Sequence, residues 1–236
     1  MKIYTINSLI EALKSNTPMN KVLISKNRRD KKIDEIKQLC KNNGIFYSFI
    51  EEEILKKKFP ESRGVFAEIS PIGFYEIEDV LKNLKMNLIL ILDRIEDQGN
   101  LGAIIRTAAA VEVDCIIISS KNSAPINETT IKTSSGAIFK TKIVKTNNIK
   151  NEINILKKKE FWIVSTKKEA FLPYFNFNFN TKVAIIMGNE NKGVSPSLFK
   201  LSDEVIKIPH SSSIESLNVS VASAIILFEA LKQKTT

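Results

Sequence analysis

The sequence feature that most constrains the fold is a series of short apolar runs separated by helical patterns. The run NLILILD at residues 87–93 is apolar at almost every position, which is typical of a strand covered on both faces. Strands that alternate with helices form a mostly parallel sheet, which binds ligands at the carboxyl ends of its strands. Further runs lie at residues 115–119, 142–145, 161–165 and 182–187, and helical patterns at 101–111, 127–135, 149–159 and about 218–232. The sequence therefore predicts an α/β fold with a mostly parallel sheet over residues 88–236.

The first 70 residues predict a smaller α/β unit. Asp30 is placed to cap a helix that stops at Gly44, and another helical pattern spans residues 6–14. Short strands are expected at residues 21–25, 45–50 and 64–69. The turn-forming sequence SPIG follows, and then a helical pattern at residues 75–85. We therefore expect one domain at residues 1–75, a linker at 76–87 and a second domain at 88–236.

The net charge and the cysteine content indicate which kinds of partner and which cellular compartment suit this chain. There are 35 Lys and Arg against 26 Asp and Glu, a net charge of +9 that is spread over both halves and suits an extended polyanion such as nucleic acid. Because 30 of the basic residues are Lys, drift in composition explains the excess equally well. Cys40 and Cys115 are far apart, which argues against a disulfide framework or a zinc site. We expect a cytoplasmic protein with no metal, and no membrane span because no apolar stretch is long enough.

The first of three motif segments is residues 93–107, a polar loop that follows a buried strand and enters a helix. Asn100 lies where a helix cap is expected, and Arg106 follows about a turn and a half later. In one interpretation, both residues face the loop end of the sheet. In the other, Asn100 only caps the helix and Arg106 is an ordinary surface cation. Arg106 is one of only five arginines and is followed by the small, apolar run TAAAV, an unusual place for a casual surface charge.

The second segment, residues 185–195, places Gly188 directly after an apolar strand, where glycine lets the backbone turn sharply and approach a ligand. A phosphate-binding Walker loop is excluded because Val194, not lysine, follows the second glycine. A helix-entry turn with Glu190 near a helix N-terminus is the alternative.

The third segment, residues 206–220, runs from a strand that ends at Pro209 through a serine-rich loop to the last helix, which Ser216 or Asn218 can cap. A hydrolase triad is improbable because the sole histidine, His210, has no identifiable carboxylate to orient it.

Together the segments resemble the SpoU/TrmH branch of the SPOUT methyltransferases, which transfer a methyl group from S-adenosylmethionine to a ribose 2′-OH in RNA. The shared motifs are Asn100-x-Gly102-x-x-x-Arg106-Thr107, Gly188-x-Glu190-x-x-Gly193, and Ile208-Pro209 followed by Ser216-Leu217-Asn218-Val219-Ser220-x-Ala222. The resemblance covers residues 87–233, and the N-terminal part resembles the small RNA-binding domain of the rRNA-modifying members. His210 departs from the pattern, since such enzymes often have methionine there.

The resemblance implies a trefoil knot at the C-terminal end of the sheet and a homodimer whose active sites combine both subunits. It implies that Arg106 is the catalytic residue. The side chains of Asn100, Glu190, Ser216 and Asn218 are expected to orient Arg106, the ribose and the methionine end of the cofactor. It places the cofactor on Met187, Gly188, Ile208, Leu217 and Asn218.

We therefore expect an S-adenosylmethionine-dependent RNA 2′-O-ribose methyltransferase that acts on a guanosine of large-subunit rRNA. A tRNA substrate, a resistance-type rRNA methylation and a non-catalytic RNA-binding protein remain alternatives. The densest basic cluster is predicted to contact RNA phosphates and consists of Lys26, Arg28, Arg29, Lys31 and Lys32.

Overall fold

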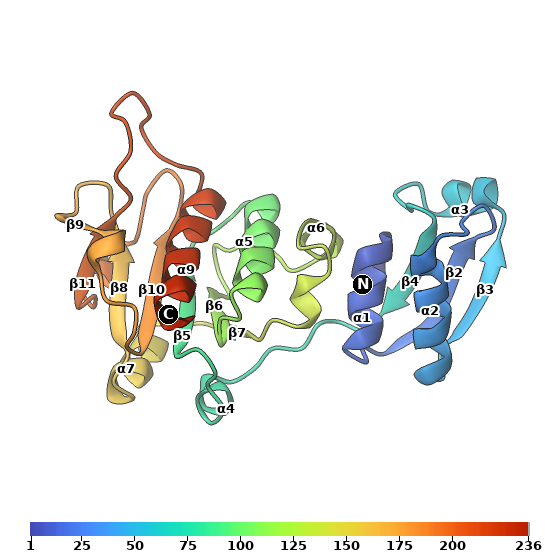
Figure 1. Cartoon of the computed structure of the whole chain (residues 1–236), viewed down its shortest axis with the longest axis horizontal. Helices are drawn as coiled ribbons and strands as arrows, with labels where there is room; N and C mark the ends of the chain where they lie inside the picture. The colour runs from blue at the N-terminus through green and yellow to red at the C-terminus, as the bar shows by residue number, and fades with distance from the viewer. Residues whose placement is uncertain (236) are drawn as a thin grey trace. The chain divides into compact units, whose positions relative to one another are not determined.

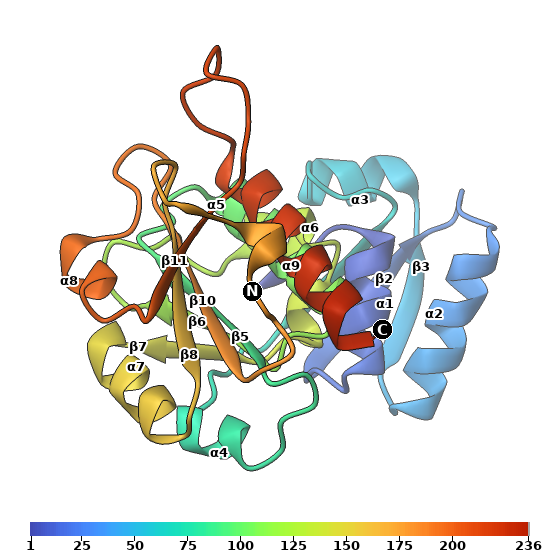
Figure 2. The same ribbon diagram turned by 60° about the vertical axis from the view of Figure 1, so that its left-hand side comes forward.

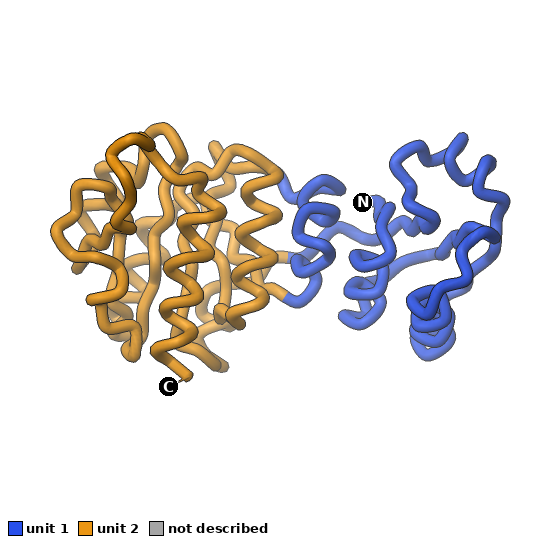
Figure 3. The backbone as a smooth tube through the Cα atoms, turned by 45° about the horizontal axis from the view of Figure 1, so that its top comes forward, with its two compact units in different colours: residues 1–73, 125–140 blue, residues 74–124, 141–236 orange. Residues whose placement is uncertain are grey.

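The computed structural model describes residues 1–235 and is seen from two sides in Figure 1 and Figure 2. Its contacts divide the chain into two compact units (Figure 3). Unit 1 consists of residues 1–73 and 125–140, and unit 2 of residues 74–124 and 141–236. No helix in residues 1–235 is both long and apolar enough to cross a membrane.

Unit 2 is built on a seven-stranded sheet whose neighbouring strands are all parallel, in the order β7-β6-β5-β10-β8-β11-β9 (Figure 1). The strands are β5 (Leu88–Asp93), β6 (Cys115–Ser119), β7 (Ile143–Thr146), β8 (Trp162–Thr166), β9 (Leu172–Pro173), β10 (Val183–Gly188) and β11 (Glu204–Lys207). β5 pairs with a strand on each side, and every one of its residues is buried. The predicted parallel sheet is confirmed.

Helices cover both faces of this sheet. The core on one face is formed by strand residues with α4 (Ile77–Leu81), α7 (Ile149–Lys158) and α8 (Pro196–Phe199). Side chains alternate along a strand, so the intervening residues point to the other face. There α5 (Gln98–Ala110) and α9 (Val219–Thr235) pack against each other, and α9 packs against β10. A short 3-10 helix, η2 (Tyr174–Asn176), follows β9.

Unit 1 has a four-stranded mixed sheet in the order β1-β4-β2-β3. Its strands are β1 (Lys2–Ile3), β2 (Met19–Ser25), β3 (Phe46–Ile50) and β4 (Val65–Ile69). Its helices are α1 (Ile6–Lys14), α2 (Lys31–Asn42), α3 (Glu52–Lys58), α6 (Glu128–Thr133) and the 3-10 helix η1 (Ala137–Phe139). The predicted cap is present, because the Asp30 side chain accepts a hydrogen bond from the N–H of Lys32.

Residues 125–140 belong to unit 1 although the chain reaches them from β6 and leaves them for β7. The buried Ser8 hydroxyl donates to the carbonyl of Ile131 over 3.1 Å. Gly136 has a φ of 84°, and a Cβ there would lie 2.7 Å from the Cα of Ser8. The two backbones therefore approach too closely for a side chain. Local sequence periodicity does not predict such packing. The domain boundaries at residues 75 and 88 therefore stay a prediction, and that prediction does not assign residues 125–140 to the first domain.

Asp114 fixes the start of the central sheet. Its buried carboxylate accepts hydrogen bonds from the N–H groups of Lys85, Met86 and Leu88, at 2.5, 3.2 and 2.9 Å. The backbone N–H of Asp114 donates to the carbonyl of Leu88 at 2.9 Å. One carboxylate thereby joins the entries of β5 and β6.

The substitution Asp114→Ala is expected to lower the free energy of unfolding of unit 2 by about 3 kcal/mol, because it leaves three N–H groups without their acceptor. Urea unfolding followed by the fluorescence of Trp162, the single tryptophan, measures this. Glu169→Ala is the control, since this exposed carboxylate only pairs with Lys167 at 3.8 Å and should change stability by less than about 0.5 kcal/mol. Equal losses in both variants would contradict the assignment.

Candidate active site

Two of the motif segments leave the sheet at neighbouring points on its carboxyl edge. In the parallel register of β5 and β10, Asp93 lies beside Gly188. The chain runs outward from β5 through β6 to β7 and then crosses to β8 on the other side. Ligands bind parallel sheets at such a reversal of strand order. The site is therefore expected in the loops that follow β5 and β10.

Asp93 and Arg94 lock these two loops together. The buried Asp93 carboxylate accepts from the N–H of Ser195 at 2.6 Å and pairs with Arg94 at 3.2 Å. Arg94 donates from Nη2 to the carbonyl of Gly193 at 3.2 Å, and its own carbonyl accepts from Nδ2 of Asn189 at 2.9 Å. Sequence reasoning missed these roles, although a carboxylate that ends an otherwise apolar strand was a usable signal.

Gly188 is required by the loop that it opens. The N–H of Gly193 donates to the carbonyl of Asn189 at 2.8 Å, which folds the loop back on itself. A Cβ at Gly188 would lie 2.2 Å from the carbonyl carbon of Gly193 and from the nitrogen of Val194. The sequence predicts a ligand beside this glycine, whereas in the structure a side chain there would first collide with the loop's own backbone.

A chain of hydrogen bonds through Asn100 joins all three motif segments. Its Nδ2 donates to Oε1 of Glu190 in a short hydrogen bond, and its Oδ1 accepts from Nδ2 of Asn218 at 3.0 Å. The Oδ1 of Asn218 accepts from the N–H of Ser220 at 2.9 Å, so Asn218, one of the two predicted candidates, caps α9. Three motif residues from distant parts of the sequence therefore meet at one point.

Asn100 itself is not the cap of α5. Asp97 is the cap, with its Oδ1 accepting from the N–H of Asn100 at 2.7 Å, so the helix begins three residues earlier than predicted. This correction explains how Asn100 contributes to the site. Because Asp97 satisfies the helix end, the amide of Asn100 is available to Glu190 and Asn218.

Arg106 and Ser216 are not part of this network in the structure. Arg106 is exposed on α5, and within residues 1–235 its side chain has no recorded partner. Six residues separate it from Asn100, about 9 Å along the helix and about 120° around it. Ser216 is exposed in the loop before α9, where Lys168 Nζ donates to the carbonyls of Ile214 and Glu215 at 3.3 and 2.8 Å. Sequence reasoning did not select Lys168.

The loop after β11 contains a buried ring nitrogen without a partner among the described residues. His210 donates from Nδ1 to the carbonyl of Ile208 at 2.8 Å, which leaves Nε2 for another partner. Nε2 is buried and has no partner among the described residues. S-adenosylmethionine carries amino, hydroxyl and carboxylate groups that can pair with such a nitrogen, so these residues fit that cofactor. The other predicted cofactor residues lie at loop entries: Met187 is buried at the end of β10, and the partly exposed Leu217 directly precedes Asn218.

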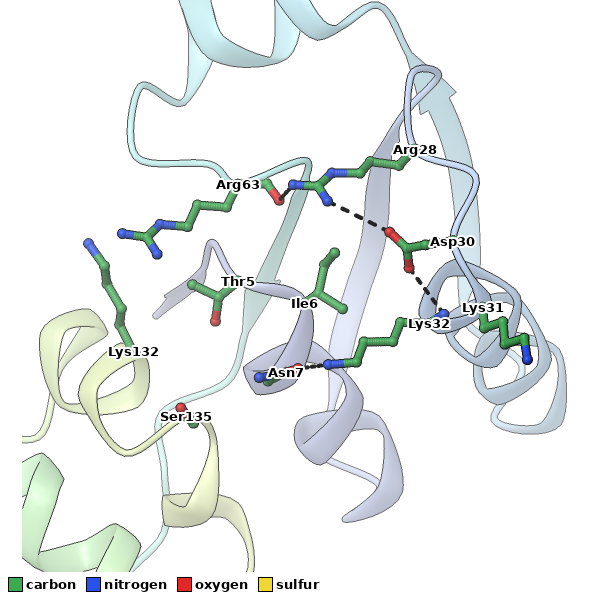
Figure 4. Close-up of a pocket in the computed structure, with 10 residues that line it drawn as sticks. All are labelled: Thr5, Ile6, Asn7, Arg28, Asp30, Lys31, Lys32, Arg63, Lys132 and Ser135. Carbon is green, nitrogen blue, oxygen red and sulfur yellow. Dashed lines mark hydrogen bonds and ion pairs between the residues drawn. The ribbon is translucent and has the colours of Figure 1, made fainter.

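The predicted basic cluster is divided by the structure. Arg28, Lys31 and Lys32 line a pocket of unit 1, whereas Arg29 does not (Figure 4). Lys26 pairs with Glu51 at 2.5 Å. Three of the five basic residues are thus gathered in one place.

Comparison with known families settles the class of this site. The SpoU rRNA methylase family matches residues 87–228, more than half of the chain. The chain belongs to this family. The RNA 2′-O ribose methyltransferase substrate-binding family matches residues 3–75. This SpoU protein is thus an RNA 2′-O-ribose methyltransferase with a substrate-binding domain, as its motifs predict.

Individual relatives agree with this assignment. RlmB of Escherichia coli, a 23S rRNA (guanosine-2′-O-)-methyltransferase, is 31% identical over 240 residues that cover 99% of this chain and 98% of RlmB. A Staphylococcus aureus protein, named for the TrmH family of tRNA/rRNA methyltransferases, is 32% identical over 95% of this chain and 92% of its own length. AviRb of Streptomyces viridochromogenes, a SpoU methyltransferase crystallised with AdoMet, has the same fold, with a TM-score of 0.84 at 21% identity over 100% of this chain and 90% of AviRb. S-adenosylmethionine, predicted from the motifs, is the cofactor of this family.

The substitution Gly188→Ala is expected to reduce the affinity for S-adenosylmethionine at least tenfold, because the new Cβ displaces the loop that follows β10. Isothermal titration measures this. Gly193→Ala is the matched control: its φ of 62° disfavours alanine by about 1 kcal/mol, but no atom lies within 4 Å of the added Cβ. A larger loss in the Gly193 variant would show that backbone strain, rather than the close approach at Gly188, controls the loop.

Proposed function

We propose that this SpoU protein methylates the 2′-OH of a guanosine in large-subunit rRNA. The observation that carries the proposal is the similarity to RlmB, which spans nearly the full length of both chains and thus includes the substrate-binding part. A tRNA substrate is the second candidate, because the S. aureus relative is named for both kinds of RNA. We place the reaction in the cytoplasm, where two free and buried cysteines, Cys40 and Cys115, are stable without a disulfide.

The residues of the chain have separate tasks in this reaction. S-adenosylmethionine supplies a methyl group that its sulfonium already activates, so the protein must position the 2′-oxygen and assist the loss of its proton. A guanidinium keeps its own proton, which makes Arg106 a poor base. We assign Arg106 to holding the adjacent phosphate and stabilising the developing negative charge on the 2′-oxygen. We assign Asn100, Glu190 and Asn218, together with Ser216 in the loop before α9, to orienting the ribose and the cofactor.

A homodimer is supported by two features. Within residues 1–235 the Arg106 side chain has no partner and forms no hydrogen bond with Asn100, so a second subunit would complete the site. The helix α9 is apolar around much of its circumference, yet Val221 and Phe228 are 49% and 51% exposed. A helix of this kind is normally covered on all sides. We also propose the trefoil knot that the family resemblance implies, with which a strand order that places β10 between β5 and β8 agrees.

The substitution Arg106→Ala is expected to lower methyl transfer at least a hundredfold and to leave the affinity for S-adenosylmethionine within about twofold, because the lost interaction is made mainly in the transition state. Transfer of a radiolabelled methyl group and isothermal titration measure the two quantities. Arg94→Ala is a useful comparison, since Arg94 binds the loop after β10 and should affect cofactor affinity instead. Wild-type turnover in the Arg106 variant would remove this residue from the mechanism.

The substitution Phe228→Asp is expected to convert the dimer into a monomer, because it places a charge in an apolar contact. Light scattering after size exclusion gives the mass. Phe171→Asp is the control: Phe171 is 96% exposed but lies outside α9, so this variant should stay dimeric. A Phe228 variant with the dimeric mass would exclude α9 as the interface.

The substrate is tested with purified protein and radiolabelled S-adenosylmethionine on three RNAs: large-subunit rRNA, small-subunit rRNA and bulk tRNA. The proposal requires one modified guanosine, in large-subunit rRNA alone. Methylation of tRNA would establish the second candidate, and cofactor binding without transfer to any RNA would favour a non-catalytic protein.

A further inference from the structure

Unit 1 contains a pocket of about 660 Å³ with a large excess of positive charge (Figure 4). Its only carboxylate is that of Asp30, which caps α2 and lies 3.6 Å from Arg28, so it is already engaged. Its cationic side chains are those of Arg28, Lys31, Lys32, Arg63 and Lys132. The described residues that line the pocket therefore leave four cations without a balancing charge.

Arg63 and Lys132 reach this pocket from separate parts of the chain. Arg63 lies shortly before β4 and Lys132 near the end of α6, and their charged ends extend toward each other (Figure 4). No ion pair of either side chain is recorded within residues 1–235. Glu128, also on α6, instead accepts from the N–H of Lys2 at 3.2 Å. Two facing cations repel each other, and an anion between them would remove that repulsion.

The backbone of residues 63 and 64 holds the Arg28 side chain in place. Its Nη2 donates to the carbonyl of Arg63 at 3.3 Å. Its side chain lies across Gly64, where a Cβ would come within 2.6 Å of Arg28 Nε. Glycine at this position, which has a φ of 87°, therefore lets the guanidinium rest on the backbone. A fixed guanidinium loses less freedom on binding than a mobile one.

The N-terminus of α1 opens into the same pocket, which is lined by Thr5, Ile6 and Asn7. The Thr5 side chain makes no capping hydrogen bond and instead donates its hydroxyl to Oγ of Ser8 at 2.8 Å. The first N–H groups of this helix are therefore open to a ligand, and their partial positive charge adds to that of the side chains.

We propose that this pocket binds a phosphate group of the RNA backbone, with Arg28, Arg63 and Lys132 contacting its oxygens. Guanidinium groups match the geometry of phosphate oxygens, and a lysine adds a point charge. This inference rests on the proposed function, because it names the part of the RNA substrate that unit 1 recognises. It also gives residues 125–140 a role in RNA binding, although they lie within the region that matches the methylase family.

The test uses the full-length protein and the double variant Arg63→Gln/Lys132→Gln. The matched control is Lys57→Gln/Lys58→Gln, which removes the same charge from exposed positions on α3 outside the pocket. Filter binding of a large-subunit rRNA fragment at several salt concentrations gives the dissociation constant and its salt dependence. The pocket variant should bind about tenfold more weakly at 0.15 M salt, with a salt slope smaller by about 1 to 2. The control should stay within about twofold, and both variants should bind S-adenosylmethionine as the wild type does.

The outcomes separate the pocket from the proposed function. If the wild type methylates the fragment but the pocket variant binds it with unchanged affinity and salt slope, the pocket assignment is overturned and the proposed function stands. Titration with inorganic phosphate tests the pocket alone: binding that the pocket variant loses, with no effect on RNA, would identify a site for free anions and overturn the assignment to RNA. If the wild type neither binds nor methylates the fragment, the proposed function fails and the assignment to RNA fails with it.

Discussion

The amide of Asn100 is the contact on which the arrangement of the site depends. It donates to Glu190 in the loop after β10 and accepts from Asn218 at the start of α9. An amide suits this position because it donates and accepts at once, which neither a carboxylate nor an ammonium can do. The cap formed by Asp97 makes the arrangement possible, since it satisfies the helix end and frees the Asn100 side chain.

The sequence predicted the parts of the structure that local physics controls. Apolar runs identified five of the seven strands of the parallel sheet, β5, β6, β7, β8 and β10, whereas the two-residue strand β9 was not predicted. Helix-end chemistry predicted the Asp30 cap and offered Asn218 as one of two candidates for the cap of α9. The start of α5 was wrong by three residues because Asp97 and Asn100 are both good caps, and sequence alone does not rank them. Gly188 was recognised as essential, but the clash with Gly193 that makes it so depends on how the loop closes.

Contacts between distant segments could not be predicted in the same way. The packing of Ser8 against Ile131 joins residues 123 positions apart, and no periodicity encodes it. It also changes what a truncation would do: removing residues 1–70 would expose the surface of 125–140 that unit 1 buries. Likewise, Lys132 joins Arg63 at one pocket only because that segment belongs to unit 1. The part of the chain proposed to bind substrate and the part proposed to catalyse the reaction are therefore not separated by one boundary in the sequence.

The claim that the three motif segments act as one unit is tested most directly by a double-mutant cycle between Asn100→Ala and Asn218→Ser. Serine can still cap α9 but cannot donate as the Asn218 amide does, so the cycle isolates the contact with Asn100. The measured quantity is kcat/KM for methyl transfer to large-subunit rRNA. We expect the double variant to lose less than the two single losses combined, by about 1 kcal/mol or more. Losses that add to within about 0.5 kcal/mol would contradict it.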